Sequence, residues 1–128
     1  MKTLLLTLFC ALSLPLFSQI TIKWKTINIV EGYEYEGKLK IYVDGDYVGE
    51  TNSCQESVWC SHKLKLKGEH TIKIEQWAKY QGTWEEKTID NNYSYDYVYE
   101  DTLVFKKRQT LTLIWDTDKP EVDATLKK

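Results

Sequence analysis

The stretch KLKIYVDGDYVGE (residues 38–50) alternates apolar and polar side chains on both sides of an Asp-Gly pair. Asp-Gly between two alternating runs is typical of a two-residue type I′ turn that joins antiparallel strands. With this pair as the turn, Tyr42 is expected opposite Tyr47, and Ile41 opposite Val48. Aromatic then meets aromatic and apolar meets apolar, so the stretch predicts a β-hairpin.

A second pair of alternating segments follows downstream. Residues 58–66 carry apolar side chains on one face and lysines on the other, and the next apolar segment begins with Ile72. A three-residue turn at Gly68-Glu69-His70 sets Leu66 opposite Ile72, whereas a two-residue turn would place Leu66 opposite a threonine. The faces therefore predict a second hairpin with the longer turn.

Strand periodicity extends over nearly all of the chain after residue 19, and no segment shows convincing helical periodicity. Further strands are expected over residues 20–30, 84–89, 93–105 and 110–115, with a bulge or bend near Thr26 where the apolar positions change phase. We predict an all-β fold, an Ig-like antiparallel β-sandwich of about seven to eight strands, over residues 19–116. Residues 117–128 are polar and aperiodic, which predicts a flexible C-terminal tail.

The first eighteen residues, MKTLLLTLFCALSLPLFS, are typical of a secretory signal peptide. Lys2 supplies the positive charge, the apolar run is too short to span a bilayer, and a cut after Ser18 is expected. A lipoprotein anchor is disfavoured because Cys10 follows a phenylalanine, and an uncleaved anchor would need about 20 apolar residues. We expect a secreted, periplasmic or cell-envelope protein with no transmembrane segment after the leader is removed.

The composition excludes some classes of partner. Without the leader, about 110 residues remain, which is the size of one domain. The formal net charge of the whole chain is −2, and no basic stripe interleaved with aromatic residues is present. The cluster Lys106, Lys107 and Arg108 is better explained as a solvated turn, so no nucleic acid is expected as a partner.

Cys54 and Cys60 remain as an even pair once the leader is gone, which predicts a disulfide in an oxidising compartment. Closing this loop is worth about 2.4 kcal/mol in the chain-entropy model. The alternative, a zinc site that adds His62 and His70, has a spacing that matches no common zinc pattern. The pairs Asp44 with Asp46 and Asp116 with Asp118 lack an EF-hand continuation and are expected in turns. No metal or cofactor is predicted.

Catalytic pairs are hard to build from this sequence. Ser61 and His62 are neighbours on a strand and point to opposite faces, so they do not pair as nucleophile and base. Glu85 and Glu86 fail in the same way, and Glu34 with Glu36 lies near glycines in an expected loop. We therefore predict that the protein is not an enzyme.

Aromatic residues are the most suggestive binding feature, with five Trp and nine Tyr. Tyr93, Tyr95, Tyr97 and Tyr99 share one strand face, as either a stacking platform or part of the core. Leu103 and Phe105 continue that face, which favours burial. A second candidate patch gathers residues near the preceding turn: Trp77, Tyr80 and Trp84.

The strings VDGDYVGET, LKLKGEHTIKI and TLTLIW, within residues 38–115, resemble a PEGA-type domain, a small extracellular or envelope β-module. The resemblance is carried by Val43-Asp44-Gly45, Val48-Gly49 and Gly68-Glu69-His70. It implies a non-enzymatic module at the cell surface or envelope.

Three functions remain open from the sequence. The first is binding of a carbohydrate or envelope polymer through the aromatic patches, which requires them to be exposed. The second is interaction with another envelope protein through an exposed strand edge, either the first strand or the Tyr-rich strand. The third is a small secreted hydrolase, which would need His62 or His70 in a pocket with a carboxylate or Ser61.

Overall fold

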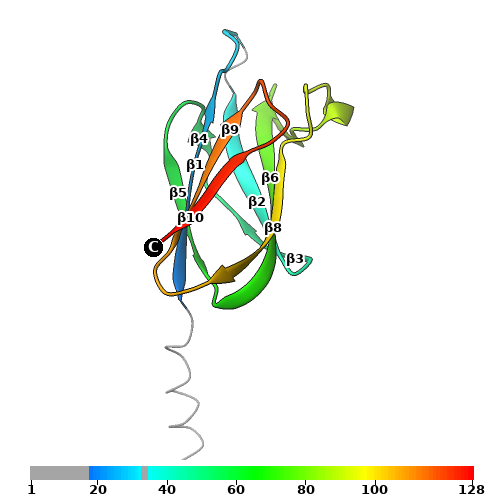
Figure 1. Cartoon of the computed structure of the whole chain (residues 1–128). Coiled ribbons are helices and arrows are strands. Elements are labelled where there is room, and N and C mark those ends of the chain that lie inside the picture. The colour runs from blue at the N-terminus through cyan, green and yellow to red at the C-terminus, as the bar shows by residue number, and fades with distance from the viewer. Residues whose placement is uncertain (1–17, 33–34) are drawn as a thin grey trace, which may run out of the picture.

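Two β-sheets lie face to face in the computed structural model, which describes residues 18–32 and 35–128 (Figure 1). Within these residues there are ten strands and one short 3-10 helix, η2 (Ile89–Asn91). The all-β sandwich expected from the sequence is therefore confirmed, with more strands than expected. The predicted signal peptide falls almost entirely outside the described residues.

The first sheet, sheet A, has the strand order β10-β9-β1-β5. Its strands are β1 (Gln19–Ile27), β5 (Cys60–Lys65), β9 (Thr110–Asp116) and β10 (Asp123–Lys127). β1 pairs antiparallel with β5 but parallel with β9, a single parallel ladder in an otherwise antiparallel architecture. The prediction that the first strand offers a free edge is wrong, because β1 is paired on both sides.

The second sheet, sheet B, is built around β6, which runs most of its length. The order is β3-β2-β6-β7, with β4 paired to β2 and β8 paired to β6. The strands are β2 (Glu36–Val43), β3 (Asp46–Glu50), β4 (Cys54–Gln55), β6 (Gly68–Tyr80), β7 (Thr83–Glu86) and β8 (Val98–Phe105). β7 and β8 pair with successive parts of β6, so both lie on the side away from β2.

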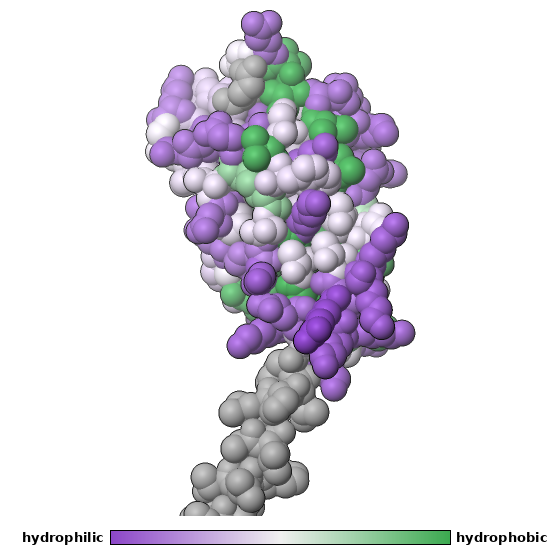
Figure 2. All heavy atoms as spheres, turned by 90° about the vertical axis from the view of Figure 1, so that its left-hand side faces the viewer, coloured by the Kyte–Doolittle hydropathy of each residue, from purple (hydrophilic) through white to green (hydrophobic). Residues whose placement is uncertain are grey.

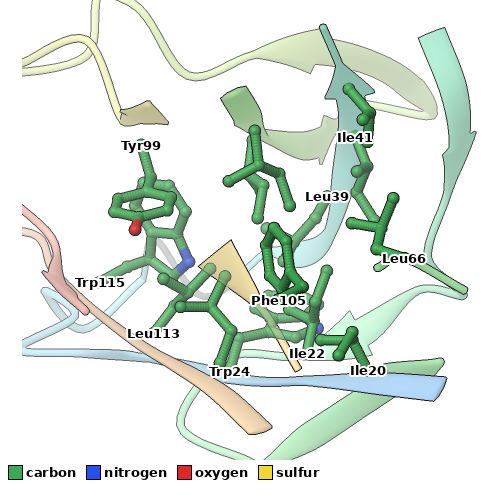
Figure 3. Packing of buried hydrophobic residues seen from close by; sticks show 14 of the residues in the cluster. Ile20, Ile22, Trp24, Leu39, Ile41, Leu66, Tyr99, Phe105, Leu113 and Trp115 are labelled. Atoms are coloured by element: carbon green, nitrogen blue, oxygen red, sulfur yellow. The ribbon is translucent and has the colours of Figure 1, made fainter. Parts of the chain in front are cut away.

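The core lies between the sheets, where the period-two alternation directs the apolar side chains of both. Figure 3 shows Ile22, Trp24 and Leu113 of sheet A meeting Leu39 and Phe105 of sheet B. One polar contact also crosses the interior: Gln76 Nε2 donates to Thr26 Oγ1 at 2.6 Å. Both residues are almost fully buried, so this hydrogen bond helps to fix how one sheet sits on the other.

The predicted Asp-Gly hairpin forms, with one difference in register. Asp44 and Gly45 have φ angles of 52° and 87°, as a type I′ turn requires, and Tyr42 pairs with Tyr47. Ile41 lies opposite Gly49 rather than Val48, because a β-bulge interrupts the ladder. Val48 is the additional residue of the bulge and its side chain is exposed, so the predicted Ile41–Val48 pair is wrong.

The second predicted hairpin is wrong. β5 pairs with β1 in sheet A, whereas β6 pairs with β2 in sheet B, so the turn before Gly68 carries the chain from one sheet to the other. Leu66 and Ile72 both point inward. Alternation alone predicts this whether their two strands pair in one sheet or lie in two opposed sheets, so it does not distinguish the two arrangements. A backbone hydrogen bond from Leu66 N to Ser18 O ties this crossing to the start of β1.

Two smaller expectations also change. Alternation in β1 continues through the buried Thr26, and the chain turns only after the strand ends, at Asn28 with φ 58°. The predicted flexible tail instead contains β10, which pairs with β9 and leaves most of its side chains exposed. This strand was not recognised in the sequence because most of its side chains are exposed and show no alternation of apolar residues, which backbone pairing does not require.

Candidate functional site

The loops at one end of the sandwich line two adjoining cavities, both partly open to solvent. They belong to the end where the β1–β2, β7–β8 and β9–β10 connections gather, at the top of Figure 1. The larger cavity has a volume of about 280 Å³ and the smaller about 260 Å³. Tyr35, Asn92 and Tyr93 line both, so the two cavities adjoin, and we call them together the loop-end cavity.

A buried ion pair lies at the wall of the loop-end cavity. Lys87 Nζ is 3.0 Å from Glu56 Oε1, and both side chains are 4% exposed. The Lys87 ammonium also lies 5.8 Å from the centre of the Tyr97 ring. Glu56 Oε2 is buried and has no hydrogen-bond partner among the described residues. A buried carboxylate oxygen without a donor is costly, so this atom has an unused capacity to accept a hydrogen bond.

Glu56 reaches the interior because a disulfide closes its loop. Cys54 and Cys60 are bonded, with their Cα atoms 6.4 Å apart, which confirms the predicted pair. The loop is further fixed by a hydrogen bond from Ser57 N to Thr26 O on β1. Ser57 itself has φ 70°, so the chain folds back sharply just after Glu56. The disulfide loop thus directs the Glu56 carboxylate inward, where it is buried against Lys87.

The four tyrosines of residues 93–99 form a wall rather than an exposed platform. Tyr97 and Tyr99 are 5% and 8% exposed and belong to the core, while Tyr93 and Tyr95 are partly buried against it. Residues 93–97 precede β8 rather than belonging to it. Tyr97 donates its hydroxyl to Thr117 O and Tyr93 donates to Glu85 Oε1. Burial raises the pKa of both Tyr97 and Tyr99 to about 12, so these phenols stay neutral.

The second predicted patch divides between two surfaces. Tyr80 is 43% exposed, packs edge to face against Tyr35 and lines the loop-end cavity. Trp77 and Trp84 lie on the outer face of sheet B, each with a lysine ammonium near its ring: Lys40 at 3.6 Å and Lys38 at 4.4 Å from the respective centroids. The structure therefore joins Tyr80 with Tyr93 and Tyr97 and separates both tryptophans from them.

The lining residues that are absent from the sequence-based candidates include Tyr35, Glu56 and Lys87. For Lys87 the sequence contains one signal, the alternation of side chains along a strand. Residues 85 and 87 alternate to the same face, opposite to the face of Trp84. Glu56 had none, since it lies 31 residues from its partner in a loop.

His70 is held in a way that opposes a role as a general base. Its Nε2 lies 2.9 Å from Lys67 O, and its Nδ1 lies 2.6 Å from Asp44 Oδ2. Both partners only accept hydrogen bonds, so both contacts are made together only when the ring is protonated and both nitrogens donate. The hydrogen bond to Asp44 raises the pKa of His70, while burial lowers the pKa of His62 on β5.

The remaining candidate sites are turn structures or separated residues. Asp44 Oδ1 also accepts from Thr71 N, and Asp116 Oδ1 accepts from Asn28 Nδ2 and Asp118 N. Among residues 18–32 and 35–128, no cluster of three or more His, Cys, Asp or Glu is placed to hold a metal. Glu34 lies outside the described residues.

The Asp44–His70 contact predicts a pH-dependent stability. His70 holds its proton more tightly when folded, so the contact contributes fully below its ordinary pKa of about 6.5 and is lost as the pH rises through the elevated value. We expect the free energy of unfolding, measured with urea, to decrease as the pH rises through this range. This decrease should be absent in His70→Gln. His62 is present in both proteins and cancels in their difference. A wild-type curve parallel to that of the variant would contradict the contact.

Comparison with known proteins gives only distant likenesses. No protein-family model matches the chain, and no curated protein matches it. Solved structures that resemble it include one described as "Trapped Toxin" (16% identity, TM-score 0.40), "Structure of Sugar Binding Protein Pneumolysin" (15%, 0.42) and "Crystal structure of listeriolysin O" (13%, 0.39). Each match covers 88% of this chain but only 23–24% of the other, so the chain spans about a quarter of their length. In the part of the chain that the structure describes, no helix is long and apolar enough to cross a membrane.

Proposed function

We propose that this protein is an exported, non-enzymatic binding module that accommodates a neutral carbohydrate unit in the loop-end cavity. The observation that carries the proposal is the unpartnered Glu56 Oε2 beside a wall of tyrosine rings. A sugar ring presents hydroxyl donors at its rim and apolar C–H groups on its faces, so it can satisfy the carboxylate and contact the rings together.

Other groups of the cavity suit the same kind of ligand. Asn92 offers an amide that both donates and accepts hydrogen bonds. Glu85, which accepts a hydrogen bond from the Tyr93 hydroxyl, borders the smaller cavity. Each volume lies just below the range of about 300–1,000 Å³ that is usual for ligand pockets, which suits one or two sugar rings better than a longer chain. Export is supported by the Cys54–Cys60 disulfide, because such bonds persist in oxidising compartments.

The proposal predicts that Tyr80→Ala weakens binding of a neutral oligosaccharide about tenfold, because removal of an exposed stacking ring costs about 1 kcal/mol or slightly more. Calorimetric titration against a panel of neutral oligosaccharides identifies a binding sugar and then compares the variants. Tyr47→Ala is the matched control, since Tyr47 is also exposed (53%, against 43% for Tyr80) but lies on β3 away from the cavity.

Asn92→Gly provides a second variant that deletes the amide and keeps the positive φ of 70° available. It is expected to weaken binding without lowering stability. If the wild-type protein binds none of the sugars at millimolar concentration, or if Tyr80→Ala and Tyr47→Ala bind equally well, the proposal is wrong.

A second candidate function is protein interaction through a strand edge. β10 and β5 end sheet A, and β3 lies at an end of sheet B, so each has one side without a strand partner among the described residues. β10 is short and mostly exposed, which leaves its outer backbone groups able to accept an added strand.

A further inference from the structure

The outer face of sheet A carries a concentration of positive charge that the chain as a whole lacks. Alternation and register place the following lysines on it: Lys23, Lys25, Lys63, Lys65 and Lys127. None of them forms an ion pair among the described residues. The carboxylates of this face belong to Asp116 and Asp123 near its loop end, and Asp116 is already engaged by Asn28 and Asp118. The whole chain has a formal charge of −2, so this basic face is a local feature.

Trp59 lies over the basic face. Its ring centre is 4.7 Å from Lys23 Nζ and 4.6 Å from Lys25 Nζ, and its side chain is 40% exposed at the end of the disulfide loop. Two ammonium groups therefore meet at one aromatic ring, and neither forms an ion pair with a carboxylate of the described residues. Each is attracted by the ring, but the two repel each other, and an anion bound beside the ring would relieve that repulsion.

From this geometry we infer that the Trp59 site binds an acidic polysaccharide, a chain of sugars that bear carboxylate or sulfate groups. The indole ring offers a flat surface for a sugar ring, and Lys23 and Lys25 meet its acidic group. Neighbouring lysines along β5 extend the positive surface to further residues of the polymer. Ser61 and Thr112 pair with Lys23 in the register, so their hydroxyl groups lie beside its charge on the same face and suit a hydroxylated ligand.

The surface suits a polysaccharide better than a membrane. Binding in a lipid interface requires a contiguous apolar face beside the basic residues. Figure 2, viewed from the side of sheet A, shows hydrophilic and intermediate residues over most of this face, with apolar ones scattered among them. In the disulfide loop, the exposed apolar residue beside Trp59 is Val58. The Trp59 site is also separate from the loop-end cavity, so its inference does not depend on the function proposed for that cavity.

The test measures affinity for a defined oligogalacturonide, a carboxylated sugar chain, by calorimetric titration at low and raised ionic strength. Trp59→Ala leaves the charge unchanged and is expected to weaken binding about tenfold. Lys23→Gln/Lys25→Gln is expected to weaken it at least as much and to reduce its salt dependence. Lys106→Gln/Lys107→Gln removes the same charge from the exposed β8–β9 turn and is expected to change affinity less than about twofold.

Each outcome decides the inference. Equal losses in the two double-lysine variants would show non-specific attraction and overturn it, as would an unchanged affinity in Trp59→Ala. Binding to vesicles that contain phosphatidylglycerol without binding to the oligogalacturonide would assign the face to a membrane and also overturn it. Tyr80→Ala should keep full affinity for the oligogalacturonide, which separates this site from the loop-end cavity. Circular dichroism of each variant verifies that it is folded.

Discussion

Lys87→Ala is expected to lower the free energy of unfolding by about 3–5 kcal/mol, because it leaves the Glu56 carboxylate buried without its cation. Both side chains are 4% exposed, so water compensates poorly for the lost ammonium. Urea unfolding followed by tryptophan fluorescence measures the change. Lys79→Ala is the matched control: this lysine is exposed on β6, and its loss is expected to cost less than about 0.5 kcal/mol.

A double variant separates the ion pair from the packing around it. Glu56→Leu/Lys87→Met removes both charges and keeps apolar volume, so it is expected to recover most of the stability lost in Lys87→Ala. The same double variant removes the acceptor at Glu56 Oε2 and should lose the neutral sugar. A Lys87→Ala protein as stable as the wild type would show that the ion pair is open to solvent.

Phe105→Ala is expected to destabilise the protein by about 3–5 kcal/mol, through loss of apolar burial and the cavity left behind. Phe105 is 1% exposed at the end of β8, where it packs between the sheets. Val104→Ala changes the preceding residue, which points outward and is 52% exposed, and should cost less than about 0.5 kcal/mol. The same urea unfolding measurement compares them. Similar losses in both variants would mean that β8 has a different face toward the core.

Local signals in the sequence were sufficient for the Asp44-Gly45 turn, the alternating strands and the disulfide. Each depends on neighbouring residues or on a simple count of cysteines. The register error at Val48 arose because a bulge keeps the turn intact and changes pairing only beyond it. The β5–β6 error is of another kind, since alternation tells which side chains point inward and not which sheet receives the strand.

The candidate site was only partly predictable. Burial of Tyr97 and Tyr99 followed from the continuation of their face to Phe105, and this prediction is confirmed. Glu56 and Lys87 were missed because a charged residue is normally expected in solvent, and because the two lie in segments that only the tertiary fold brings together. The Trp59 site was missed for a similar reason, since its lysines belong to β1 and its ring to a loop.

The parallel pairing of β1 with β9 has a consequence for when the protein can fold. β1 begins at Gln19 and its neighbour β9 ends at Asp116, so the two strands come from opposite ends of the chain. Such a distant pairing closes a long loop and forms slowly. During synthesis, sheet A therefore stays incomplete until the residues of β9, up to Asp116, have left the ribosome and can pair with β1.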